Sequence, residues 1–321
     1  MELFRGVNVD WLKLKWYFLS FSLIFSVAGL IAMGTNIAKI GSPVTLGVDF
    51  QGGTQVEVQF AQTPDADLIR QATRAAGIKD AKITAFGPAT GNEMLISLPE
   101  QHDEAALDVG QEQVKNALRE HYSNSFTVRN VAVVGPTVGK QLEKQAGLAT
   151  LYSMAGMLVY LWFRFQLIYG VAAVVACFHD TLITIGAFAL TGNEVSLTVI
   201  AAILTLIGYS MNDTIVVFDR IRENLRLSRR ESLPEVVNRS INQTLSRTVL
   251  TSGLTFLTVL SLYIFGDPVL RGFSFALVVG ILIGTYSSIA IAAPMLVAWQ
   301  EWRAKKTGSA TVLPAAKRAR T

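Results

Sequence analysis

Apolar runs of about 20 residues constrain this chain more than any other feature. A bilayer core of about 30 Å is crossed by roughly 20 residues of apolar helix. Six stretches meet this requirement: 16–35, 143–163, 167–190, 196–219, 246–265 and 272–299. Asp213 is the one acidic or basic residue between Val195 and Val217, and there is none between Val249 and Phe265. The sequence therefore predicts a polytopic α-helical membrane protein with six transmembrane helices.

The composition excludes an ordinary soluble enzyme. Charged residues make up 16% of the chain, against about 25% in soluble domains, and 51% is hydrophobic. The net charge of +4 does not indicate a nucleic-acid partner, because the basic residues gather beside the apolar runs. The single cysteine, Cys177, excludes an intrachain disulfide.

Lys and Arg in the short connections predict the orientation. With the N-terminus inside, sixteen of these residues lie on the inner side, and Arg271 is the one in the short outer loops. By the positive-inside rule, both termini are then cytoplasmic. We expect a cytoplasmic N-terminus (1–15), a first transmembrane helix (16–35), an extracytoplasmic domain (36–142), transmembrane helices two to six (143–299) and a basic cytoplasmic tail (300–321).

The domain after the first helix has the pattern of a ferredoxin-like fold. Its strands are predicted at Thr54–Ala61, Ala81–Phe86, Glu93–Leu98 and Phe126–Val134, and its helices at Pro64–Ala76 and Asp103–Tyr122. Pro64 is expected in the first helical turn, Gly77 at a helix end, and a turn at 87–92. The order β-α-β-β-α-β is the split βαβ arrangement. His102 and His121 lie among polar residues, where a solvated face is the expected setting, so this domain shows no catalytic constellation.

Ionisable residues inside the spans are candidates for function, because burying them in a membrane is costly. Asp213 lies 19 residues after Glu194 and Arg247 lies 20 residues before Asp267, so both sit at similar depth, about 30 Å from the outer edge. A reversible pair could hold the carboxylate ionised and let it take a proton when the pair separates. The alternative is that Arg247 extends to the inner interface.

Further polar residues lie near the middle and inner end of the bundle. His179 and Asp180 form a second, weaker candidate for a proton pathway, with a hydrogen-bonded packing pair as the alternative for His179. A third group lies where the fourth span leaves the membrane: Asn212, Asp219, Arg220, Arg222 and Glu223. The charged members are interpreted first as interfacial ion pairs, and the group secondly as a coupling element.

Motifs of soluble catalysis are missing from the sequence. It contains no GxxxxGK[ST] phosphate loop, no HExxH, no paired cysteines and no GxSxG. We therefore expect no enzyme activity, no cofactor and no metal, and an energy source outside the chain, such as the membrane potential.

Several motifs resemble the SecD/SecF family of bacterial protein export. They are GVDFQGGT at 47–54, VVGPTVGK at 133–140, GYSMNDTIVVFDRIREN at 208–224, QTLSRTVLTSG at 243–253 and FGDPVLRGFS at 265–274. The resemblance covers about residues 10–300. It places Asp213 and Arg247 on the family's membrane carboxylate and arginine, and it assigns five residues to signature turns: Asp49, Gly52, Gly53, Gly135 and Pro136.

The resemblance implies a function as well as an architecture. The family shares its six-helix halves with resistance-nodulation-division transporters, so a SecD chain would supply the second half. The pair would use the proton motive force to complete the export of an unfolded preprotein through SecYEG after the ATP-dependent SecA step. Partners would be SecD, SecYEG and the preprotein, with SecA and YajC indirect, in the bacterial inner membrane.

Two other classes of protein fit the sequence less well. Half of a proton-driven small-molecule efflux transporter shares the architecture, but a single insert of about a hundred residues is too small for a drug pocket and exit duct. An intramembrane protease using Asp180 and Asp213 is disfavoured, because the two acids lie at different depths with no protease motif around them.

Overall fold

Six long apolar helices dominate the structure, a computed structural model that describes residues 8–78, 81–86, 92–98, 107–122, 125–228 and 231–307. The helices are α1 (Lys15–Ile40), α5 (Pro136–Arg164), α6 (Leu167–Thr191), α7 (Leu197–Leu227), α8 (Leu233–Phe265) and α9 (Arg271–Ser287). A π-helical segment, Ser288–Ala292, continues α9 into α10 (Ala293–Thr307). Within the described residues, six helical segments are long and apolar enough to cross a membrane. The prediction of a six-span membrane protein is confirmed.

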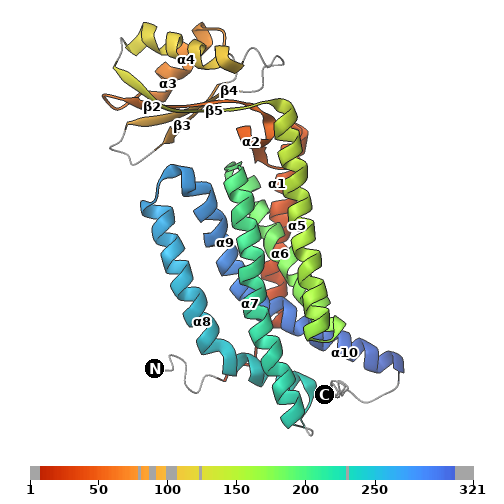
Figure 1. Ribbon diagram of the computed structural model, residues 1–321. Coiled ribbons are helices and arrows are strands. Elements are labelled where there is room, and N and C mark those ends of the chain that lie inside the picture. The colour runs from red at the N-terminus through yellow and green to blue at the C-terminus, as the bar shows by residue number, and fades with distance from the viewer. Residues whose placement is uncertain are drawn as a thin grey trace.

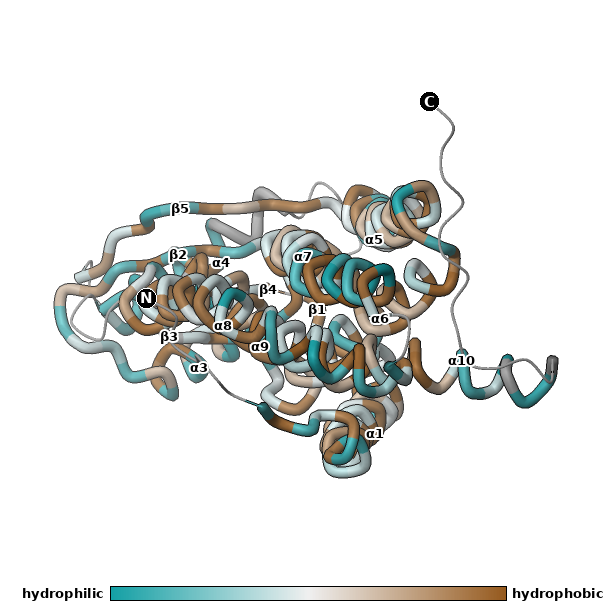
Figure 2. The backbone as a smooth tube through the Cα atoms, turned by 90° about the horizontal axis from the view of Figure 1, so that it is seen from below, coloured by the Kyte–Doolittle hydropathy of each residue, from teal (hydrophilic) through white to brown (hydrophobic). Residues whose placement is uncertain are grey.

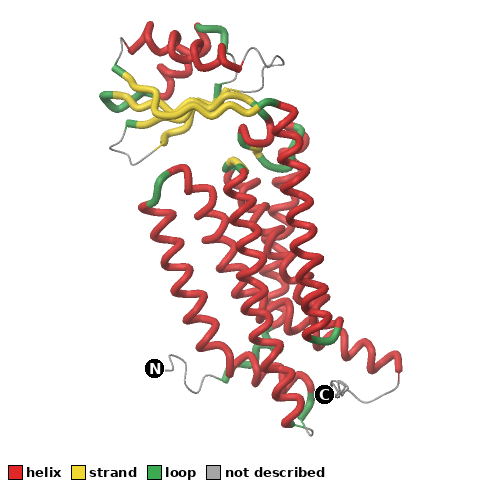
Figure 3. The backbone as a smooth tube through the Cα atoms, viewed as in Figure 1, coloured by secondary structure: helices red, strands yellow, loops and turns green. Residues whose placement is uncertain are grey.

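The helices form one elongated bundle with the β-sheet at one end (Figures 1 and 3). Helices α6, α7 and α9 make its interior, where large side chains such as Phe188, Leu206 and Met211 are fully buried. Helix α1 packs on α6 through two glycines, and a Cβ atom added to Gly29 would lie 2.9 Å from the Cα of Gly186. Close backbone contact of this kind is typical of membrane helices.

Hydrophobic residues recur along the helices of the bundle, which Figure 2 shows from below. Large hydrophobic side chains lie exposed on α1, α5 and α8, among them Trp16, Leu23, Phe163, Leu254 and Phe265. Faces of this kind need lipid or a partner chain to cover them.

Several helices extend beyond the predicted apolar runs. Helix α8 begins at Leu233, well before the predicted start at 246. There Ser232 and Glu235 form a capping box, in which the Glu235 carboxylate accepts the Ser232 N–H at 2.9 Å. Helix α7 likewise continues beyond 219 to Leu227.

The second part of the molecule, here called the sheet domain, runs from β2 to β5. It contains β2 (Gly53–Phe60), α3 (Ala66–Ala75), β3 (Lys82–Phe86), β4 (Glu93–Leu98), α4 (Leu107–Tyr122) and β5 (Phe126–Val134). The strands are ordered β3-β4-β2-β5, with every neighbouring pair antiparallel. Helices α3 and α4 cover the face away from the bundle (Figure 1), over a core that includes Val56, Ile69, Ile96 and Leu118.

Most predicted elements of the sheet domain agree with the structure, and β4 and β5 have the predicted bounds. The placement of Pro64 in the first helical turn is wrong. Helix α3 begins at Ala66, and the Asp65 carboxylate caps it by accepting the N–H of Asp67 at 2.8 Å. Gly77 lies just after the C-cap residue, with φ +86°.

The remaining predictions for the sheet domain concern two histidines, a turn and the start of a helix. His121 is exposed, as expected. His102, residues 87–91 of the predicted turn and the first four residues of the helix predicted from Asp103 lie outside the described residues.

Three short elements that the sequence did not predict join the two parts of the molecule. They are β1 (Thr45–Leu46), α2 (Val48–Gln51) and β6 (Glu194–Val195). Strand β1 pairs in parallel with β6, so the segment leading into the sheet domain contacts the segment leading into α7.

Candidate functional site

Asp213 lies inside the bundle on α7, with only 2% of its surface exposed. The hydroxyl of Ser252 on α8 donates a hydrogen bond to its Oδ2 at 2.6 Å. Thr285 on α9 also interacts with this carboxylate. The carboxylate is thus held between three helices, and the groups that contact it are neutral hydroxyls.

Arg247 lies on α8, one turn and a half from Ser252 and with its side chain exposed. Its positive charge acts on Asp213, yet the two residues form no ion pair within 4.0 Å. The structure therefore places the predicted partners in the same region without direct contact. The role of this pair as a reversible proton switch stays a prediction.

Asp180 forms a second buried carboxylate cluster. Its Oδ2 accepts hydrogen bonds from Ser210 on α7 at 2.6 Å and from Ser287 at the end of α9 at 2.7 Å. Its Oδ1 lies 3.0 Å from Nδ1 of His179. The side chain of Asp180 is 1% exposed, and the buried Nε2 of His179 has no hydrogen-bond partner among the described residues.

The two carboxylates are connected through α7 and α9. Ser210 lies one helical turn before Asp213 on α7, and Thr285 and Ser287 lie two residues apart on α9. The π-helical segment Ser288–Ala292 follows at once, and such segments are frequent at functional sites. Asp180 and Asp213 therefore belong to one polar region of the bundle interior.

A row of buried hydroxyls on α8 leads to Asp213 and was missed in the sequence. Its four residues recur at a spacing of four, so they lie on one helix face: Ser240, Thr244, Thr248 and Ser252. The Thr248 hydroxyl is buried without a hydrogen-bond partner among the described residues. The regular spacing was the signal that could have revealed this row.

The charged residues at the end of α7 away from the sheet domain pair with one another. Arg222 contacts Asp219 at 2.7 Å, and Arg220 contacts Glu223 at 2.7 Å. Arg164 at the end of α5 also approaches Asp219, at 3.6 Å. Asn212 lies exposed, away from these pairs along α7. The charged residues lie at the end of the bundle opposite the sheet domain.

The signature turns meet where the sheet domain joins the bundle. Gly52 has φ +79° and Gly53 φ +128°, backbone conformations that favour glycine. Gly135 is the N-cap of α5 and Pro136 its first residue. The Asp49 carboxylate accepts the backbone N–H of Leu197, the first residue of α7, at 2.8 Å. The five signature residues thus lie in one joint.

Metal binding finds no support in the described part of the chain, where no group of three or more His, Cys, Asp or Glu residues could hold an ion.

The fold and the site define a class of protein: polytopic membrane proteins with ionisable groups inside the bundle. The defining features are six spanning helices, carboxylates buried within them and a sheet domain after the first helix. A family model for the C-terminal part of the protein export membrane proteins SecD and SecF matches residues 113–302. A model of the SecD/SecF GG motif matches residues 40–64. The chain belongs to the SecD/SecF family.

Named relatives and solved structures agree with this assignment. The protein translocase subunit SecF of Koribacter versatilis is 54% identical, over 98% of this chain and 97% of its own. The SecF of Desulfurispirillum indicum is 43% identical, over 92% and 93%. The crystal structure of SecDF, a translocon-associated membrane protein from Thermus thermophilus, is 37% identical with a TM-score of 0.81. This chain matches it over 94% of its own length but covers only 40% of the SecDF chain.

Proposed function

We propose that this chain is a SecF-type translocase subunit that works with a SecD-type partner in protein export. Relatives of nearly equal length carry the name of this subunit. The chain corresponds to less than half of the SecDF chain, which supports a second chain as the missing part. The apolar faces of α1, α5 and α8 are surfaces on which such a partner could pack.

The energy for this work is proposed to come from the proton motive force. The observation that carries the proposal is Asp213, a carboxylate buried in the membrane region that interacts, within the described part of the chain, with the neutral hydroxyls of Ser252 and Thr285. A carboxylate in such a setting can be neutralised by a proton, since an isolated buried charge is costly. Arg247 biases the charged form from a distance, and Asp180 with His179 forms the secondary proton site.

Proton uptake at Asp213 would change the packing of three helices. When the carboxylate is ionised, it attracts the hydroxyls of Ser252 and Thr285 and the charge of Arg247. When it is protonated, the attraction to Arg247 disappears. Alternating between the two forms would shift α8 and α9 against α7, which is a movement that export can use.

The orientation and the partners complete the proposal. The sheet domain lies outside the bacterial inner membrane and has a ferredoxin-like fold, supported by its β-α-β-β-α-β order and its strand order. Both termini lie in the cytoplasm, and the ion pairs of Asp219 and Glu223 lie at the inner interface. The substrate is an unfolded preprotein leaving SecYEG after SecA has acted, with YajC as an indirect partner and no hydrolytic role for this chain.

Half of a small-molecule efflux transporter is the second candidate, favoured only by the shared helix architecture.

Vesicles that contain this chain, a SecD-type chain and SecYEG test the proposal. A preprotein is first held partway through the channel, and SecA is then depleted of ATP. We expect an imposed proton gradient to complete export, and vesicles lacking this chain to fail. Completion at the same rate without a gradient would contradict the proposal.

A further inference from the structure

The sheet domain is tied to the start of α7 by backbone contacts. The two residues of β1, Thr45 and Leu46, pair with Glu194 and Val195 of β6. The N–H of Gly47 donates to the carbonyl oxygen of Val195 at 2.9 Å. These contacts join the segment before β2 to the segment before α7, so the two cannot move independently.

Asp49 adds a cap on α7 that the helix does not supply for itself. Ser196 occupies the N-cap position, but its hydroxyl lies 2.8 Å from the hydroxyl of Thr198 and makes no capping bond. The Asp49 carboxylate instead accepts the N–H of Leu197 at 2.8 Å. A negative charge at this helix end also interacts favourably with the helix dipole.

Helix α2, which carries Asp49, packs closely on α5 and reaches α7 through the Asp49 hydrogen bond. A Cβ atom on Gly139 of α5 would lie 2.6 Å from the carbonyl oxygen of Phe50, so the two backbones are in direct contact. A Cβ atom on Gly52 would lie 3.0 Å from the Cα of Pro136. Because β2 starts and β5 ends here, with Gly53 paired to Val134, both connections of the sheet domain lie beside the contact between α2 and α5.

A weaker contact lies farther out in the sheet domain. The edge strand β3 carries Lys82, whose Nζ lies 2.6 Å from the carboxylate of Glu194. Both side chains are partly exposed, at 45% and 27%, so this ion pair is easily exchanged for water. The sheet domain extends from the top of α5 over the ends of α7 and α9 (Figure 1), and this ion pair is a contact between its far edge and the bundle.

We propose that Asp49 is a positioning residue that couples α7 to the sheet domain. Asp213 lies 16 residues along α7 from Leu197, about 24 Å of continuous helix. A shift of α7 when Asp213 changes its charge reaches Leu197 through this helix, and the Asp49 cap and the β1–β6 pair pass it to the sheet domain. The ion pair of Lys82 and Glu194 opens when the domain turns about this joint. The inference rests on the proposed function and names the residue that links proton binding to the domain outside the bundle.

Replacing Asp49 and then closing the joint with a disulfide tests this role. Cys177 is the only cysteine of the chain, so Cys177→Ser gives a clean background. In it, Asp49→Ala should slow gradient-driven export at least about fivefold, the scale expected for a lost carboxylate cap. Asp213-dependent proton uptake should persist. Asp49→Asn, which keeps an acceptor oxygen, should be intermediate.

A disulfide between positions 46 and 195 should restore the coupling. These residues are register partners in β1 and β6, so Leu46→Cys and Val195→Cys lie at a spacing suited to a disulfide. Added to Asp49→Ala, the oxidised pair should return export to at least about half the wild-type rate, and reductant should abolish the gain. Asp65→Ala removes a comparable cap inside the sheet domain and should leave export unchanged.

Three results would overturn the role of Asp49: wild-type export by Asp49→Ala, no rescue by the oxidised pair, or failure of the pair to oxidise. Export by the wild-type chain at the same rate with and without a proton gradient is a different outcome. It contradicts the proposed function, whereas the role of Asp49 is judged by the difference between Asp49→Ala and its cross-linked form.

Discussion

The hydroxyl of Ser252 lies 2.6 Å from Oδ2 of Asp213, joining the middle of α8 to α7 inside the bundle. Arg247, the expected partner of this carboxylate, acts on it only from beyond ion-pair distance. The resting arrangement is therefore a carboxylate held by neutral hydroxyls, with a charged residue at the exposed face of α8. Such a carboxylate can change its protonation without first breaking an ion pair.

Replacing Ser252 should weaken transport. A hydrogen bond to a charged group contributes about 1.5–3 kcal/mol, so Ser252→Ala should slow gradient-driven export by about tenfold or more. Thr258→Ala is the matched control, because the exposed Thr258 hydroxyl donates only to the carbonyl oxygen of Leu254 in its own helix. Equal export by the two variants, measured at equal protein level, would remove Ser252 from the site.

The glycine contact between α1 and α6 should tolerate no side chain. Gly29→Ala places a methyl group 2.9 Å from the Cα of Gly186, and overpacking of this kind costs about 1–3 kcal/mol. We expect a lower unfolding temperature in detergent. Gly34→Ala, on the same helix with no atom within 4 Å of the new Cβ, should leave the temperature unchanged or raise it. Similar losses in both variants would mean that α1 does not pack on α6 at Gly29.

Hydropathy was sufficient to predict the spanning helices, because each contains about 20 consecutive residues that are mostly apolar. The strands of the sheet domain were also predictable, since β2 alternates buried residues such as Val56 and Val58 with polar ones facing outward. Helix ends were less predictable, because caps such as Ser232 and Asp65 decide them rather than hydropathy.

Contacts between distant segments could not be predicted. Asp49 and Leu197 lie 148 residues apart in the chain, and β1 and β6 have two residues each, too few for any periodic signal. The choice of Ser252 over Arg247 as the contact of Asp213 depends on how α8 is rotated in the bundle. The number of residues between two positions on a helix fixes their relative depth in the membrane but not this rotation.

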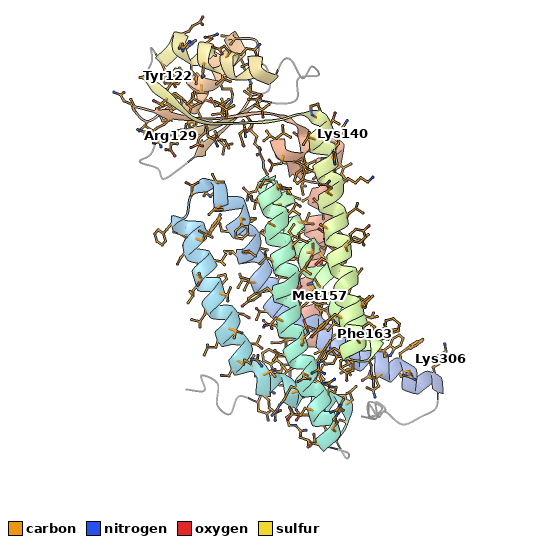
Figure 4. All side chains as sticks on the ribbon, viewed as in Figure 1. Tyr122, Arg129, Lys140, Met157, Phe163 and Lys306 are labelled. Atoms are coloured by element: carbon orange, nitrogen blue, oxygen red, sulfur yellow. The ribbon has the colours of Figure 1, made fainter. Side chains whose placement is uncertain are left out.

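The stability of the sheet domain should depend on pH through Glu57. Burial and the carboxylates of Glu93 and Asp267 raise the pKa of Glu57 above its usual value of 4.5, against the opposing charge of Arg129. Figure 4 shows Arg129 on the sheet face that points to the bundle. Because folding raises this pKa, the stabilising contribution is complete below pH 4.5 and is lost as the pH rises through the raised pKa.

Glu57→Gln should therefore stabilise the sheet domain at pH 7 by less than about 1 kcal/mol, the range for charges near the surface, and have little effect at pH 4. Hydrogen exchange of the β2 amides in the full chain measures this difference. An equal gain at both pH values would show that charge is not the cause.

The orientation in the membrane can be tested by labelling. On the Cys177→Ser background, a cysteine replacing Asn92 should react with an impermeant thiol reagent added to intact spheroplasts. A cysteine replacing Ser228, at the end of α7 away from the sheet domain, should react only after the membrane is opened. The reverse pattern would overturn the positive-inside assignment.

Asp213 is proposed to carry protons under the control of Arg247. Proton flux and gradient-driven export are measured in vesicles at equal protein level for four chains: the wild type, Asp213→Asn, Arg247→Met and the double variant. We predict that Asp213→Asn abolishes both activities, that Arg247→Met leaves proton flux but uncouples it from export, and that the double variant behaves as Asp213→Asn. A double variant that exports normally under a proton gradient would contradict the claim and leave both residues a structural role.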